Sequence, residues 1–349
     1  MKRIGFVKTL SAAGVVALIP SFTLSEQKNI NEQKVIKPKA LRIGDLIGIV
    51  TPGSYITKEE LKDSIKNIES LGFNAVYSDK VLEMNGYFSA NDKDRAEDIM
   101  KMFSRKDVKA IMCARGGYGC ARILPMLDYN VIKNNPKILI GYSDVTALLL
   151  GITNQTGLVT FHGPVGISSF NEFTQKYFNE ILVDGKKKIK MMNVSDDNPE
   201  EPTEIYTIRK GKCSGKLIGG NLSVMISLIG TEYDIDYTDK IIFIEEIGEE
   251  PYRIDRMLTQ MIQSDKFKNA KGIALGTFRK CEVKKIEPSF ENSFSLKEVL
   301  IERLSSLGIP VAYGLSFGHI KNKITLPLCI NAEFDAGEKT ITLLENAVE

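Results

Sequence analysis

Short apolar runs alternate with segments of helical periodicity along the chain from Leu41 onward. The short runs are typical of buried strands, and the periodic segments are typical of helices with one apolar face. Parallel strands need crossover segments between them, so the alternation favours an α/β fold with a mostly parallel sheet, Rossmann- or flavodoxin-like, with helices on both faces. Strands are predicted in this half at Leu46–Val50, Phe73–Tyr77, Val108–Cys113, Ile138–Gly141 and Leu158–Phe161.

The helices of this half follow from the same pattern. A capping-box pair, Thr57 and Glu60, opens the first helix, and Gly72 closes it. Further helical segments are predicted near residues 91–104, 119–127 and 144–153. Ligands of such sheets bind beyond the carboxyl ends of the strands, so we expect the functional residues there.

The pattern changes after residue 183. Residues 184–205 contain a lysine run and then a polar, proline-containing stretch, which predicts a linker. We therefore expect an N-terminal domain at 40–183 and a smaller, mixed α+β C-terminal domain at 206–347. The second domain is predicted to have strands at Ile241–Glu245, Ile273–Gly276, Val311–Gly314, Ile324–Leu328 and Thr340–Leu344, and helices near 221–229, 254–263 and 295–306.

The charge and the metal-binding residue types exclude some classes of function. The chain has 46 basic and 44 acidic residues, for a formal net charge of +2. A chain so close to neutral has no bulk attraction for nucleic acid. It has two histidines, His162 and His319, and five cysteines without C-x-x-C spacing. Neither a zinc site nor a disulfide framework is therefore expected.

Residues 1–25 have the order of an export signal. A basic start precedes an apolar stretch from about Leu10 to Leu24, and Thr23-x-Ser25 provides a cleavage site. The stretch is short for a membrane span, which needs about 20 residues, so the mature protein is expected to be periplasmic or secreted, without a stable span. The general secretory and twin-arginine routes both stay open. An uncleaved anchor or a buried helix is the alternative, and without use of the signal the protein would be cytoplasmic.

Ser143 lies in a predicted strand-to-helix turn, Gly141-Tyr142-Ser143-Asp144. A serine at such a turn is exposed, and the free N–H groups of the helix N-terminus can receive the oxyanion of an acyl-transfer intermediate. The G-x-S-x-G pattern of hydrolases is not met, because Val145 stands two residues after the serine. The alternative is that Ser143 or Asp144 merely caps the helix.

A glycine-rich loop, Arg115-Gly116-Gly117-Tyr118-Gly119, follows the predicted strand before it. The loop fits neither the dinucleotide-binding nor the P-loop pattern, so a phosphate site has little support. Its strand and the strand before Ser143 are expected to be neighbours. The loop therefore fits better as a second oxyanion donor, with a simple tight turn as the alternative.

A serine nucleophile needs a base, and the base is usually oriented by a carboxylate. His162 follows a strand of the first half, and His319 lies in the second half. Glu245 and Glu246 stand at the carboxyl end of an apolar strand, where alternation places them on opposite faces. The spacing selects neither one histidine nor one glutamate.

Taken together, these segments resemble the LD-carboxypeptidase family of serine peptidases, which includes muramoyltetrapeptide carboxypeptidases and the related microcin C immunity peptidases. The resemblance covers nearly all of residues 40–347. It rests on VTPGS at 50–54, RGGYG at 115–119, GYSDVTAL at 141–148, FHGP at 161–164, GGNL at 219–222, IEE at 244–246 and PYRIDRML at 251–258.

The resemblance implies a Ser–Glu–His triad, carried here by Ser143, Glu245 and His319. His319 would take the proton of Ser143, which would attack the amide between an L-centre and a terminal D-residue. Glu245 would fix the imidazole tautomer. The family also implies that the active site lies between the two domains. Its well-known members work in the cytoplasm, so the export signal is a departure that puts the compartment in doubt.

The same mechanism assigns roles to four further residues. Backbone N–H groups of Asp144 and of Gly116 or Gly117 would hold the oxyanion, and Arg115 would anchor the terminal carboxylate of the substrate, because a guanidinium matches that group's geometry. No metal or cofactor is needed.

The expected substrate is a murein tetrapeptide that releases D-alanine, and a homodimer is compatible with this function. The segment after Glu245 offers no aromatic residue beyond Tyr252 to stack on a nucleobase, which favours murein. An immunity-type amidase acting on aminoacyl-nucleotide mimics and a non-catalytic periplasmic binding protein stay open as alternatives.

Overall fold

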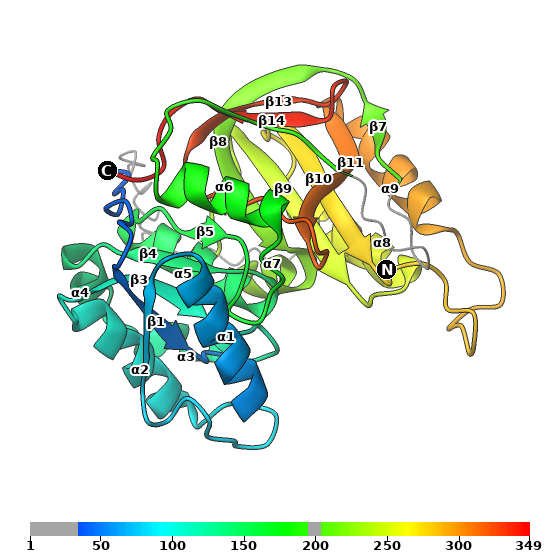
Figure 1. Ribbon diagram of the computed structural model, residues 1–349. Coiled ribbons are helices and arrows are strands. Elements are labelled where there is room, and N and C mark those ends of the chain that lie inside the picture. The colour runs from blue at the N-terminus through cyan, green and yellow to red at the C-terminus, as the bar shows by residue number, and fades with distance from the viewer. Residues whose placement is uncertain (1–33, 195–203) are drawn as a thin grey trace, which may run out of the picture. The chain divides into compact units, whose positions relative to one another are not determined.

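Two sheets organise the residues that the computed structural model describes, which are 34–194 and 204–349 (Figure 1). The predicted export signal at 1–25 lies outside the described residues, as does the central part of the predicted linker. Residues 35–349 form one compact unit. No helix in the described part of the chain is long and apolar enough to cross a membrane.

The N-terminal sheet has six strands in the order β12-β5-β4-β3-β1-β2. Every pair from β5 to β2 is parallel, as the alternation of strands and helices predicts, and only β12 is antiparallel to its neighbour. The strands are β1 (Leu46–Val50), β2 (Asn74–Tyr77), β3 (Val108–Cys113), β4 (Ile138–Gly141), β5 (Phe161–His162) and β12 (Leu326–Pro327).

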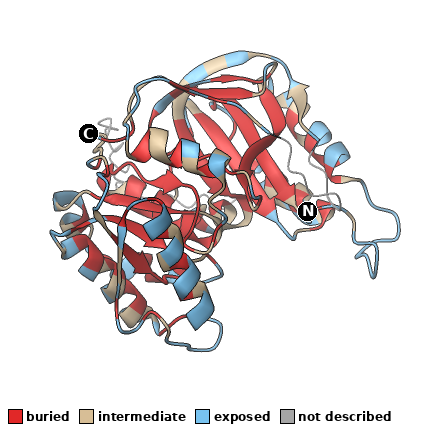
Figure 2. Cartoon of the chain, in the orientation of Figure 1, coloured by how far each residue is buried: buried red, intermediate tan, exposed pale blue. Residues whose placement is uncertain are grey.

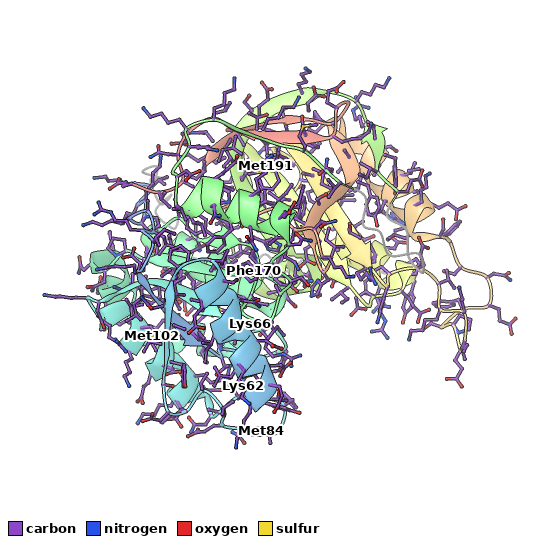
Figure 3. The ribbon with its side chains drawn as sticks, in the orientation of Figure 1. Lys62, Lys66, Met84, Met102, Phe170 and Met191 are labelled. Atoms are coloured by element: carbon purple, nitrogen blue, oxygen red, sulfur yellow. The ribbon has the colours of Figure 1, made fainter. Side chains whose placement is uncertain are left out.

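Helices connect these strands and cover the sheet. The helix predicted from Thr57 and Glu60 is α1, and both hydrogen bonds of its capping box are present. Lys62 and Lys66 lie on its exposed face, whereas Met102 of α2 is buried (Figure 3). The helices of this half are α1 (Lys58–Ser70), α2 (Asp92–Ser104), α3 (Cys120–Ile123), α4 (Tyr129–Asn134), α5 (Thr146–Thr156) and α6 (Glu172–Leu182), with 3₁₀ turns at 124–126 and 143–145.

The second sheet has eight strands in the order β6-β14-β13-β8-β9-β10-β11-β7. Its centre, from β8 to β11, is parallel, and the outer strands are antiparallel, so the sheet is mixed; with its helices it forms the α+β arrangement predicted for this half. The strands are β6 (Ile189–Met191), β7 (Tyr206–Arg209), β8 (Lys212–Asn221), β9 (Lys240–Ile247), β10 (Gly272–Arg279), β11 (Val311–Gly318), β13 (Asn331–Asp335) and β14 (Thr340–Leu343). The helices are α7 (Leu222–Leu228), α8 (Pro251–Gln263) and α9 (Leu296–Leu304), with a 3₁₀ turn at 305–307.

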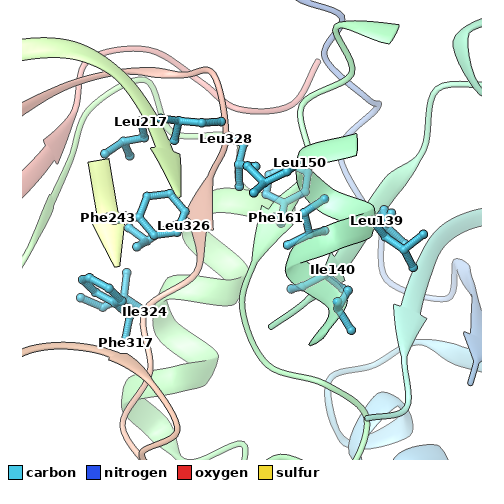
Figure 4. Close-up of a cluster of buried hydrophobic side chains, with 14 of the residues drawn as sticks. Leu139, Ile140, Leu150, Phe161, Leu217, Phe243, Phe317, Ile324, Leu326 and Leu328 are labelled. Atoms are coloured by element: carbon cyan, nitrogen blue, oxygen red, sulfur yellow. The ribbon is translucent and has the colours of Figure 1, made fainter. Parts of the chain in front are cut away.

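One continuous core of buried apolar side chains joins the two sheets. Figure 2 shows that the strands of both sheets are mostly buried. In Figure 4, Ile140 and Phe161 of the N-terminal sheet belong to the same cluster as Phe243 and Phe317 of the second sheet. Each such side chain contributes about 1.5–3 kcal/mol of burial energy, so this shared core holds the two sheets together.

Two strands lie outside the domain boundaries predicted from the sequence. The expected linker at 184–205 includes strand β6, which pairs with β14 of the second sheet. Its residues Ile189 and Met191 are buried, so this part of the segment belongs to the core. The strand predicted at Ile324–Leu328 is shorter, and as β12 it pairs with β5 of the N-terminal sheet. Both pairings join residues far apart in sequence, which a local pattern cannot reveal.

Candidate active site

Ser143 stands at the turn between β4 and α5 in a strained backbone conformation. Its φ angle is +63°, a region that residues other than glycine rarely adopt. The strand ends at Gly141, one 3₁₀ turn covers 143–145, and α5 begins at Thr146. Strain of this kind is frequent at functional sites and resembles the sharp turn that presents the nucleophilic serine in α/β-hydrolases, although the G-x-S-x-G pattern is absent.

Neither Ser143 nor Asp144 caps the helix that follows, because that helix start has no side-chain cap. The buried Asp144 carboxylate instead accepts a hydrogen bond of 3.0 Å from the backbone N–H of Cys120, at the start of α3. The alternative that this turn merely supplies a helix cap is therefore wrong. Asp144 ties the serine turn to the glycine-rich loop.

Gly116 lies directly against Ser143. A Cβ atom placed on Gly116 would stand 2.8 Å from the Ser143 Cβ, 3.0 Å from its Oγ and 3.2 Å from the Asp144 nitrogen. The strands that precede the two loops, β3 and β4, are neighbours as expected. Gly117 faces elsewhere: a Cβ on it would meet the Ser54 side chain. The absence of a side chain at 116 is therefore what permits the backbone to approach the serine.

Glu245 and His319 form a hydrogen-bonded pair at the carboxyl ends of β9 and β11. The Glu245 Oε2 atom lies 2.7 Å from Nδ1 of His319. The Glu245 side chain is fully buried, and the imidazole is 15% exposed. A Cβ on Gly318 would stand 2.9 Å from the Glu245 Cβ, so this glycine allows the end of β11 to reach Glu245 past the intervening strand β10.

Two opposing effects act on the pKa of Glu245. Burial raises it, but attraction to His319 and the hydrogen bond to its ring outweigh burial, so the pKa lies below its ordinary value. The second carboxylate oxygen, Oε1, is buried without a hydrogen-bond partner among the described residues. His319 is therefore the hydrogen-bond partner of the Glu245 carboxylate in the described part of the chain.

Glu246 points to the opposite face of β9 and does not contact His319. Its carboxylate accepts hydrogen bonds from the Asn221 side chain at 3.0 Å and from the backbone N–H of Ser223 at 2.7 Å. Burial, together with the nearby charge of Glu245, raises its pKa. Glu246 therefore holds the start of α7 and is not paired with His319.

His162 is buried behind this pair and does not bond to a carboxylate. Neither of its ring nitrogens has a hydrogen-bond partner among the described residues. Its ring meets those of Phe243 and Phe317 edge-on, with centroids 5.3 and 6.3 Å away. Burial lowers its pKa to about 4, so the imidazole is neutral at ordinary pH.

Contacts on both sides of Ser143 join the serine turn to the second sheet. The ring of Tyr142 lies 4.8 Å from that of His319, edge to face. The backbone N–H of Asn221, at the end of β8, donates a 3.0 Å hydrogen bond to Oγ1 of Thr146. Ser143 therefore sits where the N-terminal sheet meets the second sheet.

Sequence reasoning missed Tyr142 and Thr146 as contacts of this site. Both lie within the GYSDVT segment, and the only local signal was their closeness to Ser143. Burial raises the pKa of the Tyr142 hydroxyl to about 12, so this group stays protonated. Their partners come from the second sheet, and the sequence does not show that pairing.

Arg115, the predicted carboxylate anchor, lies at the edge of the site. Its side chain is 37% exposed and its Nη1 is 3.3 Å from Oε1 of Glu60.

All five cysteines are free thiols. No group of three or more potential ligands among the described residues is placed to hold a metal ion.

Comparison with known protein families gives two matches along the chain. Residues 47–163 match the N-terminal domain of LD-carboxypeptidases, and residues 214–334 match their C-terminal domain. Ser143 lies in the first match, and Glu245 and His319 lie in the second.

Similar proteins cover almost the whole chain. A probable murein peptide carboxypeptidase of Bacillus subtilis is 36% identical over 312 residues, 88% of this chain and 94% of that protein. The microcin C7 self-immunity protein of Escherichia coli is 30% identical, over 87% of this chain and 94% of its own length. The crystal structure of muramoyltetrapeptide carboxypeptidase from Oxalobacter formigenes superposes with a TM-score of 0.71 at 32% identity, over 85% of this chain and 97% of that one. The chain therefore belongs to the LD-carboxypeptidase family of serine peptidases.

Proposed function

We propose that this protein is a serine-type LD-carboxypeptidase that releases terminal D-alanine from murein tetrapeptides. The observation that carries the proposal is the hydrogen-bonded Glu245–His319 pair beside the strained Ser143 turn. A carboxylate, an imidazole and a hydroxyl in this order are the parts of a serine hydrolase triad. The similarity to a murein peptide carboxypeptidase and to a muramoyltetrapeptide carboxypeptidase supports the choice of substrate.

The roles of the triad follow from the hydrogen bond. Because Nδ1 of His319 faces Glu245, Nε2 is the nitrogen left to accept the proton of Ser143. The serine oxygen then attacks the amide carbonyl before the terminal D-residue, and His319 returns the proton to the leaving amine. Glu245 stabilises the imidazolium formed in between. Water releases the acyl-enzyme with His319 again as base.

Backbone N–H groups of Asp144 and Gly116 are proposed to hold the oxyanion. Both residues adjoin the serine, since a Cβ on Gly116 would reach Ser143 and the Asp144 nitrogen. Gly117 supports this arrangement by packing against Ser54. In a water-poor site each such donor lowers the barrier by about 2.7–4 kcal/mol. Arg115 is proposed to contact a carboxylate of the substrate.

Incubation with a murein tetrapeptide tests the proposal. The purified protein is expected to release free D-alanine and to leave an analogue ending in L-alanine intact. Ser143→Ala is expected to abolish the release while retaining the melting temperature. Absence of free D-alanine after incubation with folded wild-type protein would contradict the proposal.

An immunity-type amidase is the second candidate, and one observation keeps it in the comparison. The segment after Glu245 is not the only place where an aromatic side chain could stack on a nucleobase. Tyr55, Tyr87 and Tyr118 are exposed on the loops near Gly116 and Gly117. The assay therefore includes an aminoacyl sulfamoyl adenosine. Faster turnover of that compound than of the tetrapeptide would assign the protein to the immunity group.

A non-catalytic binding protein is the third candidate. It would have no need for a reactive serine, so a covalent serine probe separates the two classes. Labelling of the wild-type protein and its loss in Ser143→Ala support the enzyme. An unlabelled wild-type protein that binds the tetrapeptide would support the binding protein.

Export of the mature protein is part of the proposal. It rests on the basic and apolar order of residues 1–25, and murein is available outside the cytoplasm. Mass spectrometry of the native protein is expected to find a start near Glu26. An intact Met1 on a cytoplasmic pool would contradict this part.

A further inference from the structure

A hollow of about 370 Å³ opens beside the glycine-rich loop, and its lining residues all precede Ser143 in the sequence. It is lined by Ser54, Tyr55, Gly86, Tyr87 and Arg115. A volume of this size falls in the range of small-molecule sites, which is about 300–1,000 Å³. Nothing in the triad or the oxyanion hole uses it.

Contacts through Ser54 and Gly116 connect the lining of the hollow to Ser143. The backbone N–H of Ser54 donates a 3.2 Å hydrogen bond to the carbonyl of Gly116, and Ser54 Oγ accepts from the Tyr118 N–H at 3.3 Å. Gly116 in turn lies against Ser143. The loop that carries Ser54 is therefore held next to the serine turn.

Arg115 is the charged residue of this lining. Its guanidinium is contacted by Glu60 of α1, which is not itself part of the lining. Oε2 of Glu60 accepts the backbone N–H of Thr57 at 2.8 Å, as part of the capping box of α1. Oε1 of Glu60 holds Nη1 of Arg115 at 3.3 Å. A guanidinium has more N–H donors than this one contact uses and no acceptor, so it remains free to bind an anion.

Two residues of the lining are tyrosines with exposed side chains. Tyr87 is 61% exposed and Tyr55 is 36% exposed. Tyr118, 56% exposed, continues the surface, with its ring 5.7 Å from that of Tyr87. Aromatic rings around a single guanidinium suit a peptide that carries a carboxylate. They do not suit a polycation.

We propose that this hollow is a specificity subsite for a carboxylate of the peptide substrate, contacted by Arg115 and oriented by Glu60 as a positioning residue. The inference rests on the proposed function. It extends that function by naming the chemistry that selects the substrate. Two carboxylates of a tetrapeptide could occupy the site: the terminal one of D-alanine, or a side-chain carboxylate of the residue before it.

Two amidated peptides distinguish these sources. One analogue is amidated at the C-terminus, and the other at the side-chain carboxylate of the residue before D-alanine. Wild-type protein is expected to show a KM roughly 10- to 100-fold higher for the analogue that lacks the recognised carboxylate, as for a lost hydrogen bond to a charged group. Arg115→Met is expected to raise KM for the unmodified peptide by a similar factor and to stop discriminating against that analogue.

Variants of the capping box test the role of Glu60. Glu60→Gln keeps the capping box, because glutamine also serves at this position, but it removes the charge opposite Arg115. KM is expected to rise a few-fold with kcat unchanged. Thr57→Ala is the matched control: it weakens the cap, lowers the melting temperature by a few degrees and leaves KM unchanged. A lower KM in Glu60→Gln would show that Glu60 competes with substrate and would overturn the positioning role.

The outcomes separate this inference from the proposed function. If Arg115→Met and Arg115→Lys fold, hydrolyse peptide and discriminate as the wild type does, the subsite is wrong and the carboxypeptidase stands. If the wild type hydrolyses no peptide, the proposed function is wrong. Calorimetric binding of the same three peptides to wild type and Arg115→Met then decides the subsite, because equal affinities would overturn it.

Discussion

The two sheets build different halves of one site and build them in different ways. The N-terminal sheet presents Ser143 and Gly116 on turns after its strands, with a strained φ at the serine. The second sheet presents Glu245 within β9 and His319 in the bend directly after β11, and a hydrogen bond joins the two side chains. The Glu245 side chain is fully buried, whereas the imidazole of His319 is 15% exposed. The proposed nucleophile and the proposed base therefore both follow strands, and only the proposed acid lies on a strand.

The difference has an electrostatic reason. A buried carboxylate is costly unless it is paired, so Glu245 can be fully buried only because His319 meets it. A hydroxyl carries no charge, and its turn can remain partly open. The site therefore depends on the contact between the sheets, which each of the following predictions probes.

The largest effect is expected when either half loses its reacting group. Ser143→Ala and His319→Gln should each lower kcat on the tetrapeptide by about 10⁶-fold, because triad members act as a unit. The double variant should be no slower than either single variant. Single-turnover assays measure this, and additive losses would show that the two sheets contribute independently.

Replacement of the acid should cost less, and its neighbour gives a control. Glu245→Gln should lower kcat by about 10⁴-fold, since it disturbs the imidazole tautomer without removing the base. Glu246→Gln replaces an acceptor that faces the Ser223 N–H. It should lower the melting temperature and keep kcat/KM within about tenfold. The reverse ranking would mean that Glu246 is the acid.

The close approach of the glycine-rich loop should matter next. Gly116→Ala places a Cβ 2.8 Å from that of Ser143, so the serine or the loop must shift, and kcat should fall by about 10²-fold. Gly337→Ala, in a turn of the second sheet where a Cβ would stand 3.2 Å from a carboxylate oxygen, is the control and should keep full activity. Equal activity of the two variants would argue against an oxyanion role for the 116 backbone.

The smallest effect concerns stability at the junction of the sheets. The folded pKa of His162 is about 4, lowered by burial, so the unfolded chain, with a histidine pKa near 6.5, binds the proton more readily. Stability from this residue is present above pH 6.5 and is lost as the pH falls toward 4, by on the order of 3 kcal/mol.

Denaturant unfolding between pH 7 and pH 4 measures this loss. His162→Phe, which removes the titrating ring and keeps an aromatic side chain, should have a flatter profile over that range. A variant profile that matches the wild type would show that other groups account for the acid sensitivity.

Local sequence determined most of the elements that carry the site. The apolar runs predicted β1, β3 and β4 with their observed bounds, and the Thr57–Glu60 pair predicted the start of α1. The strand-to-helix turn at Ser143 and the neighbouring glycine-rich loop were also readable. These features depend on residues a few positions apart, where backbone sterics and hydrogen bonding act directly.

Tertiary structure decided the partners. Alternation placed Glu245 and Glu246 on opposite faces but could not tell which face meets His319, and the family resemblance, not the spacing, chose Glu245. The resemblance likewise chose His319 over His162. Neither the local pattern nor the resemblance predicted the Asp144 bond to Cys120 or the ion pair between Glu60 and Arg115. The sheets pair strands that are distant in sequence, and burial between them sets which polar groups are joined. The chain specifies those contacts only through the packing of the whole core.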